Sequence, residues 1–169
     1  MAAINLPVAN AGLVLFQQFI PVYLERLQLI SNHQFCSVEA QRKAVHYIQL
    51  LATGQTRTEE RQLALNKLLC GLPLTEQVGI GITPTTQELA LAVALVRAVI
   101  DMWPTVSSTS RDSFRQSFLI RAGTLIEHEN SWELAVEKRT YDTLLNQFPI
   151  NYSIIYSPWM EKPLNVSWP

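Results

Sequence analysis

The sequence predicts an α+β fold that is mainly α, with five to six short helices followed by a small antiparallel sheet. Apolar residues recur at helical spacing along most of the first 120 positions. Beyond residue 124, short segments instead alternate apolar and polar side chains, as strands do. The length of 169 residues suits one unit that buries about 70% of its unfolded surface. We therefore expect residues 1–169 to form a single compact domain.

The first helical pattern covers residues 10–29, where Asn10 is a suitable N-cap. Its apolar positions repeat every three or four residues: Leu13, Phe16, Ile20, Leu24 and Leu27. Pro21 falls inside this pattern and removes a backbone donor, so we expect either a kink or two abutting helices.

Two further helices are marked by their ends. The second begins after Ser37, a good N-cap, and ends at Gly54, which suits the left-handed C-terminal position. The third opens with the capping-box pattern from Thr56 to Glu59 and ends at Gly71. Turn-forming residues then fill positions 72–84, which we expect to be the most mobile loop.

A capping box at Thr85–Glu88 opens the next helix, which we expect to run to Trp103 and to end before Pro104. Apolar side chains surround most of its circumference. A helix of this kind lies either in the centre of a core, which we favour, or against another chain.

The last third of the chain contains the predicted sheet. A short helix from Arg111 should bury two phenylalanines, Phe114 and Phe118, and residues 140–148 should form another helix. Residues 124–128 and 131–138 alternate around a polar turn and predict a β-hairpin. Two more strands are expected at residues 152–156 and 164–168, and prolines 158 and 163 keep the link between them out of a central strand.

Composition excludes several classes of function. Hydrophobic residues make up 48% of the chain and charged residues 16%, which indicates either a large core or apolar surface reserved for partners. The net charge is −1 and the 13 basic residues are scattered, so we expect no nucleic-acid partner. No apolar run reaches the roughly 20 residues that span a bilayer, so membrane insertion is not expected either.

Catalytic or metal-binding patterns are weak. His33 and Cys36 have ligand-like spacing but make only half a zinc site, and we interpret them as a capping-region histidine and a buried thiol. Cys70 is interpreted in the same way, as a small hydrophobic group. His128 lies between two glutamates in the predicted hairpin turn, where a solvated charge cluster is expected. We predict no enzymatic activity, no cofactor and no metal site.

The tryptophans suggest where partners bind, because large aromatic side chains concentrate in cores and at interface hot spots. Trp132 and Trp168 lie in alternating segments and are assigned to the core. Trp159 lies in the proline-bracketed link and is the strongest candidate partner contact, with Met160 beside it and Trp103 at the end of the apolar helix as further candidates.

Several stretches, taken together and in order, resemble the contractile injection system tape measure family. They are residues 10–15, 44–54, 65–73, 99–104, 118–125, 132–137 and 158–168. The resemblance covers nearly the whole chain and implies a component of a phage-tail-like particle of bacteria. It implies no catalytic residues.

The resemblance also implies a place within such a particle. In this family the pattern lies at the C-terminal end of longer tape measures, so we expect a terminal or anchoring module. Its partners would be tube, hub or baseplate proteins, or further copies of itself. We expect assembly in the cytoplasm, within a particle that is released or docked at a membrane. The alternative is a cargo adaptor or chaperone-like binding module of the same system.

Overall fold

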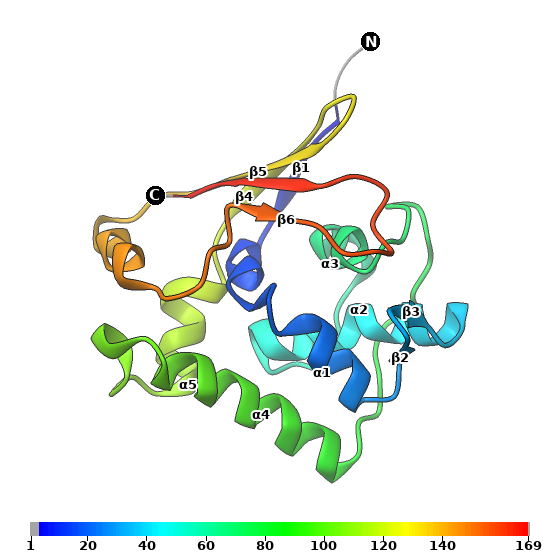
Figure 1. Ribbon diagram of the computed structural model, residues 1–169, viewed down its shortest axis with the longest axis horizontal. Coiled ribbons are helices and arrows are strands. Elements are labelled where there is room, and N and C mark those ends of the chain that lie inside the picture. The colour runs from blue at the N-terminus through cyan, green and yellow to red at the C-terminus, as the bar shows by residue number, and fades with distance from the viewer. Residues whose placement is uncertain (1–3, 169) are drawn as a thin grey trace.

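Alternating side chains in the last third of the chain build the centre of a five-stranded sheet. The computed structural model describes residues 4–168. Strands β4 (Gly123–Glu127) and β5 (Trp132–Val136) form the predicted hairpin, with Leu125 opposite Leu134. The residues of β5 alternate between buried and half-buried, which confirms that one face lies on the core. Figure 1 shows the sheet lying over the helices.

The sheet is mixed, so the prediction of a purely antiparallel sheet that follows the helices was wrong. The strand order is β1-β4-β5-β7-β6, with β1 at Asn5–Val8, β6 at Ile154–Ile155 and β7 at Leu164–Ser167. Strand β7 pairs with β5 in parallel, and the N-terminal strand β1 adds to the free edge of β4. Both pairings join segments that are distant in the sequence, and local alternation carries no information about them.

The N-terminal helical pattern forms two abutting helices, as one of the two alternatives predicted. The 3₁₀-helix η1 (Ala11–Phe16) is buried along its whole length, and α1 (Ile20–Arg26) follows it. Pro21 does not break a helix, because it lies in the first turn of α1, where its missing N–H is not needed. The prediction that Asn10 caps η1 was wrong, since its side chain makes no capping hydrogen bond.

The side chain of Asn10 instead enters a buried amide cluster. Its Nδ2 donates to Gln49 Oε1 and to Asn66 Oδ1, both at 2.7 Å. Asn66 Nδ2 donates in turn to Gln49 Oε1 and to the Val45 carbonyl, both at 3.0 Å. The three amides are at most 5% exposed, and they tie the start of η1 to α2 (Val38–Thr53) and α3 (Ala64–Leu69).

Replacing Asn66 with alanine is expected to lower the free energy of unfolding by about 2–3 kcal/mol. The substitution removes one acceptor and two donated hydrogen bonds, and it leaves polar groups of Asn10 and Gln49 buried without full partners. Urea unfolding curves measure the change. The matched control is the exposed amide Gln18, whose replacement by alanine should change stability by no more than about 0.5 kcal/mol. Equal losses in the two variants would contradict a structural role for the cluster.

The ends of α2 confirm the sequence signals. Ser37 Oγ accepts from the Ala40 N–H at 2.9 Å, and Gly54 adopts φ +77° at the C-terminus. The capping box predicted at Thr56–Glu59 is wrong, because α3 begins only at Ala64. Residues 56–58 are instead held against residues 80–82 by backbone hydrogen bonds, of which Ile82 N–H to the Thr56 carbonyl is one.

A second, small sheet was not predicted. Strands β2 (Ile30–Ser31) and β3 (Gln34–Phe35) form a tight hairpin between α1 and α2. Its two turn residues, Asn32 and His33, have φ +54° and +64°, the left-handed conformation that two-residue hairpin loops require. His33 is therefore a turn residue, and the prediction that it lies at a helix cap was wrong.

Helix α4 (Thr86–Asp101) begins with the predicted capping box, in which Thr85 and Glu88 each bond the other's backbone. It ends at Asp101, before Trp103. The favoured prediction, that α4 is central in the core, was wrong: its buried side chains form only one stripe, consisting of Ala92, Val96, Val99 and Ile100. In Figure 1, α4 lies on the side of the molecule farthest from the sheet.

Aromatic side chains fill the core between the helices and the sheet. Helix α5 (Arg111–Phe114) continues into a π-helical turn at Arg115–Leu119, and together they bury Phe114 and Phe118 as predicted. Trp103 contacts both rings, with centroid distances of 6.2 and 4.7 Å. The helix predicted at 140–148 is the 3₁₀-helix η5 (Thr140–Gln147), and its Leu144 carbonyl accepts from Trp103 Nε1. Trp132 and Trp168 are 7% and 8% exposed, which confirms their assignment to the core.

Candidate interaction surfaces

The three candidate partner contacts differ in what they offer to a partner. Trp103 is fully buried and Met160 is 3% exposed, so both side chains lie inside the fold. Trp159 is half-buried: its Nε1 donates to the Leu69 carbonyl at 2.9 Å, and its ring packs edge-on against Phe35 at 5.1 Å. Trp159 alone of the three presents part of its ring to solvent, and its role as a contact remains a prediction.

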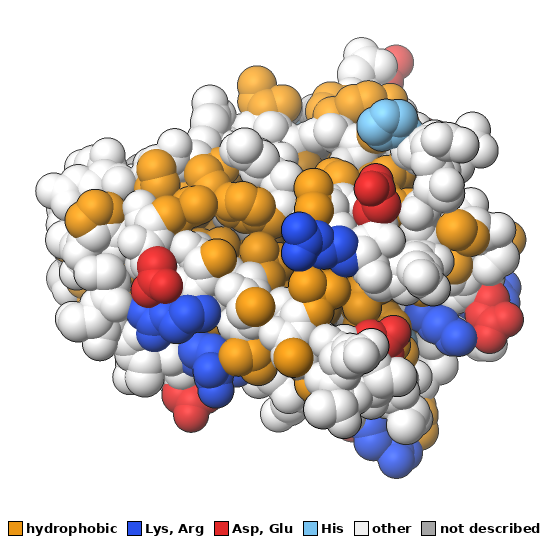
Figure 2. Space-filling view, turned by 60° about the horizontal axis from the view of Figure 1, so that its bottom comes forward, with side chains coloured by type: hydrophobic (Ala, Val, Ile, Leu, Met, Phe, Trp, Pro, Cys, Tyr) orange, Lys and Arg blue, Asp and Glu red, His pale blue; other side chains and the backbone are white. Residues whose placement is uncertain are grey.

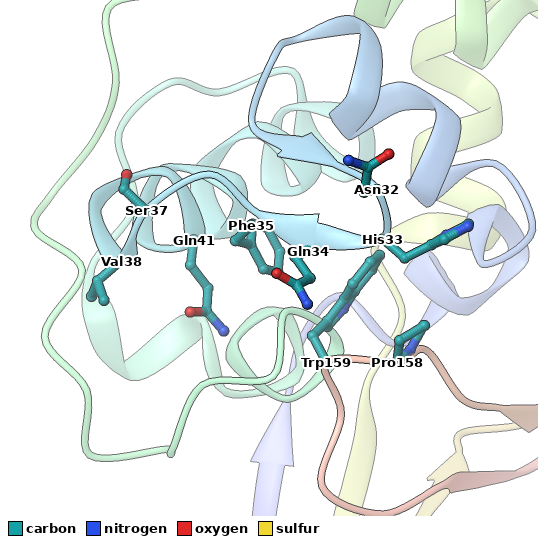
Figure 3. Close-up of a pocket in the computed structure, with 9 residues that line it drawn as sticks. All are labelled: Asn32, His33, Gln34, Phe35, Ser37, Val38, Gln41, Pro158 and Trp159. Atoms are coloured by element: carbon teal, nitrogen blue, oxygen red, sulfur yellow. The ribbon is translucent and has the colours of Figure 1, made fainter.

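Trp159 and Phe35 form the wall of an open hollow of about 510 Å³. Figure 3 shows the two rings with polar side chains from the β2–β3 hairpin and from α2 around them. His33 and Gln34 come from the hairpin, and Gln41 comes from α2, where its Nε2 donates to the Cys70 carbonyl at 2.8 Å. We call this feature the Trp159 hollow. The sequence pointed to Trp159, but the hairpin that supplies Phe35 was missed.

Gly71 explains how the proline-bracketed link reaches this hollow. A Cβ at position 71 would lie 2.1 Å from the Trp159 carbonyl oxygen, so the link can approach α3 only because residue 71 is glycine. Its φ of +76° also suits glycine. The close approach places the Trp159 indole beside the Leu69 carbonyl to which it donates.

The second surface is a groove between α1 and α4, with a volume of about 310 Å³. Its lining is apolar apart from Arg26 and the hydroxyl of Tyr23, which donates to the Tyr47 carbonyl. Val22, which lines the groove, is 55% exposed. Figure 2 shows this side of the molecule, where hydrophobic side chains gather in a broad band with charged groups mostly around them.

The groups that carry chemistry do not converge. Within residues 4–168 no three His, Cys, Asp or Glu side chains are placed to hold a metal ion. The prediction of two buried thiols is half right: Cys70 is buried, and burial raises its pKa, but Cys36 is exposed. His128 Nε2 lies 3.0 Å from Glu133 Oε1 on the exposed hairpin. None of the helices within residues 4–168 has the length and apolar character that a bilayer crossing requires.

Among residues 4–168, one ion pair is fully buried, and its role is structural. The guanidinium of Arg121 donates to both carboxylate oxygens of Asp142, at 2.7 and 2.9 Å, and to the carbonyls of Ser117 and Glu137. Trp168 Nε1 donates to the same carboxylate at 3.0 Å. The pair joins the π-helical turn, η5 and Trp168, the residue that follows β7.

Burial opposes ionisation of Asp142, but the hydrogen bonds from Arg121, the Arg139 N–H and Trp168 outweigh it and hold the pKa of Asp142 below its ordinary value. A lowered folded-state pKa adds stability above the unfolded pKa of about 3.9, and this stability is lost as the pH falls through the folded pKa. Asp142→Asn should therefore be less stable than the wild type at pH 7, and the difference should shrink below about pH 4. Urea midpoints of both proteins between neutral and acid pH measure it. A difference that does not change with pH would contradict the assignment.

Comparison with known proteins gives one family. The family model described as contractile injection system tape measure protein matches residues 2–168. A search of curated proteins and a search of solved structures each returned no match.

Proposed function

The chain belongs to the contractile injection system tape measure protein family, and from this premise we propose that it is a structural module that anchors the tape measure at the end of the tube or in the baseplate. Its partners on this proposal are tube, hub or baseplate proteins. It is assembled in the cytoplasm and acts within the finished particle.

The observation that carries the proposal is that the matched region is a folded body. Its longest helices, α2 and α4, have 16 residues each, or about 24 Å at about 1.5 Å per residue. A ruler has to be extended, whereas these helices are short and pack against one another. A body with a shared hydrophobic core acts through its surfaces rather than through its length.

The surfaces support protein partners. The described residues expose several large apolar side chains, including Val22, Val38 and Ile154, each more than half exposed. The net charge of −1 and the scattered bases offer no track for a phosphate backbone. Of these, Val22 lines the apolar groove between α1 and α4, and a contiguous apolar patch is typical of a surface that is covered in an assembly.

The experiment removes the coding region for this chain from a bacterium that produces the particle and images the particles by electron microscopy. The proposal expects few complete particles, or tubes of irregular length, and restoration when the chain is supplied from a plasmid. Complete particles of unchanged number and tube length would refute the anchoring role.

Point variants then test the Trp159 hollow as the contact. His33→Asp adds a charge at the exposed rim of the hollow, and aspartate tolerates the left-handed conformation of this turn residue. The variant should co-sediment less with tube or baseplate proteins than the wild type. Tyr156→Asp is the matched control, because Tyr156 is 59% exposed and does not line the hollow.

The alternative function, a cargo adaptor or chaperone-like module, is favoured by one observation: the Trp159 hollow combines aromatic walls with amide groups that suit an extended peptide. The same deletion separates the two functions. An adaptor's loss leaves complete particles of normal length that lack cargo, whereas an anchor's loss changes the particles themselves.

A further inference from the structure

Between residues 89 and 96 the outward side of α4 is apolar, whereas a helix that faces water is normally polar on that side. Residues 89–96 contain no charged or polar side chain. Leu89 and Val93 are 39% and 36% exposed, and the alanines at 90, 94 and 98 are exposed as well. A helix that is apolar nearly all round either lies in the centre of a core or packs against another chain. Because the core covers only one stripe of α4, contact with another chain is the explanation that remains.

The apolar surface continues from α4 onto α1. Leu91, Ala94, Leu95 and Ala98 line the groove from the α4 side, and Val22 and Arg26 line it from the α1 side. We call these six residues the α1–α4 face. Arg26 is exposed, and within residues 4–168 it makes no ion pair or hydrogen bond through its side chain. The face is thus apolar apart from Arg26, which has no acidic partner among the described residues.

We propose that the α1–α4 faces of two copies of this chain meet across a two-fold axis, with the two α4 helices antiparallel and Ala94 near the axis. Alanine at the crossing allows the backbones to approach to about 8 Å, at the close end of helix packing. Such an interface is isologous, so each residue of the face makes its contact twice.

Charge complementarity identifies the second copy as the occupant. Figure 1 shows α1 and α4 side by side in opposite directions, so that the end of α1, which carries Arg26, lies toward the first half of α4. An antiparallel partner helix places its C-terminal end there. That end carries Asp101, which is 61% exposed and, within the described part of the chain, pairs with Arg97 one turn away, at 2.9 Å. Each unpaired Arg26 therefore meets an Asp101 from the other copy.

The available area indicates how strong the association is. Helix α4 is about 24 Å long, and with α1 beside it the face is roughly 20 Å wide, or on the order of 500 Å² per copy. The total of about 1,000 Å² is at the lower limit for a specific interface. We therefore expect a dimer with a dissociation constant in the micromolar range rather than an obligate dimer.

Sedimentation equilibrium of the purified protein over a wide concentration range tests the proposal. The wild type should change from the 19.1 kDa monomer to a dimer as concentration rises. Ala94→Arg should weaken dimerisation by at least about tenfold, because two like charges then meet at the axis. Ala94 is exposed and arginine is a good helix former, so the fold should be retained, which circular dichroism checks. Ile80→Arg, at a 60% exposed loop residue, is the matched control and should dimerise normally.

A charge swap tests the antiparallel arrangement. Arg26→Asp and Asp101→Arg should each raise the dissociation constant by about tenfold, and the double variant should bring it back toward the wild-type value. A strictly monomeric wild type overturns the proposal, as does an Ala94→Arg variant that dimerises normally. A further outcome also overturns it: the wild type is monomeric, and Ala94→Arg no longer co-sediments with tube or baseplate proteins. The face would then bind a different protein rather than a second copy. None of these sedimentation results depends on the anchoring role.

Discussion

Replacing Arg121 with alanine is expected to lower the free energy of unfolding by about 3–5 kcal/mol. Arg121 is fully buried and Asp142 is 2% exposed. The substitution leaves the carboxylate of Asp142 in the core with only the Trp168 indole and one backbone N–H as donors. It also removes the cation–π contacts of the guanidinium with Tyr141 and Trp168, whose ring centroids lie 5.6 and 5.2 Å from its central carbon. A charge buried without its partner is among the most costly defects in a core.

Chemical denaturation followed by tryptophan fluorescence measures this loss. The matched control is Arg42→Ala, since Arg42 also binds a carboxylate, that of Glu76 at 2.6 Å, but is 46% exposed. Its replacement should change stability by no more than about 1 kcal/mol. The double variant Arg121→Met with Asp142→Leu should be more stable than Arg121→Ala, because it leaves no buried charge. If Arg121→Ala were no worse than the control, the pair would not hold the core together.

Local signals predicted the parts of the fold that depend on a few neighbouring residues. The Ser37 cap, the left-handed Gly54 and the capping box at Thr85 each involve atoms at most four positions apart, so sequence spacing specifies them. The β4–β5 hairpin was predictable for the same reason, because its alternation and its turn lie in one short stretch. A local pattern can still mislead, since Thr56–Glu59 fits a capping box and forms no helix start.

Pairings between distant segments could not be predicted in this way. Strand β1 joins β4 across more than 100 residues, and the parallel pairing of β5 with β7 depends on the path of the chain between them. The same holds for polar side chains: Asn10 looked like a helix cap because its partners, Gln49 and Asn66, are visible only in the folded chain. A buried polar group finds its partner in three dimensions, whatever its neighbours in sequence.

The candidate surfaces were only partly predictable. Trp159 stood out as a large aromatic residue between prolines. Phe35, which packs against it, lies on a hairpin that was not predicted, because its left-handed turn contains no glycine. Asn32 was the available signal, since asparagine adopts positive φ more readily than most residues. The apolar circumference of α4 was visible in the sequence. Only the structure shows which of its sides the core covers.

Adding a single methyl group at Gly12 is also expected to lower the stability of the fold strongly. A Cβ at this position would lie 1.8 Å from the carbonyl oxygen of Phe118 and 2.6 Å from the Cα of Leu119. Both are backbone atoms of the π-helical turn, so no change of rotamer can relieve the overlap. Either η1 or this turn must move, and the Ala11 N–H to Arg121 carbonyl bond of 2.9 Å links the two segments. Gly12→Ala should therefore lower the free energy of unfolding by more than about 4 kcal/mol.

Gly79→Ala separates this steric effect from the conformational freedom of glycine. Gly79 has φ +78°, but an added Cβ would meet nothing within 4 Å, so its replacement should cost only the strain of a left-handed alanine, about 1–2 kcal/mol. Expressed side by side at low temperature, Gly79→Ala should give folded protein with a slightly lower melting temperature, whereas Gly12→Ala should give little folded protein or a far lower melting temperature. Similar melting temperatures would mean that η1 does not pack directly on the π-helical turn.

Because Arg121 lies two residues beyond that turn, its ion pair with Asp142 should weaken along with the packing at Gly12. We therefore expect Gly12→Ala and Arg121→Ala together to destabilise the chain by less than the sum of their separate effects.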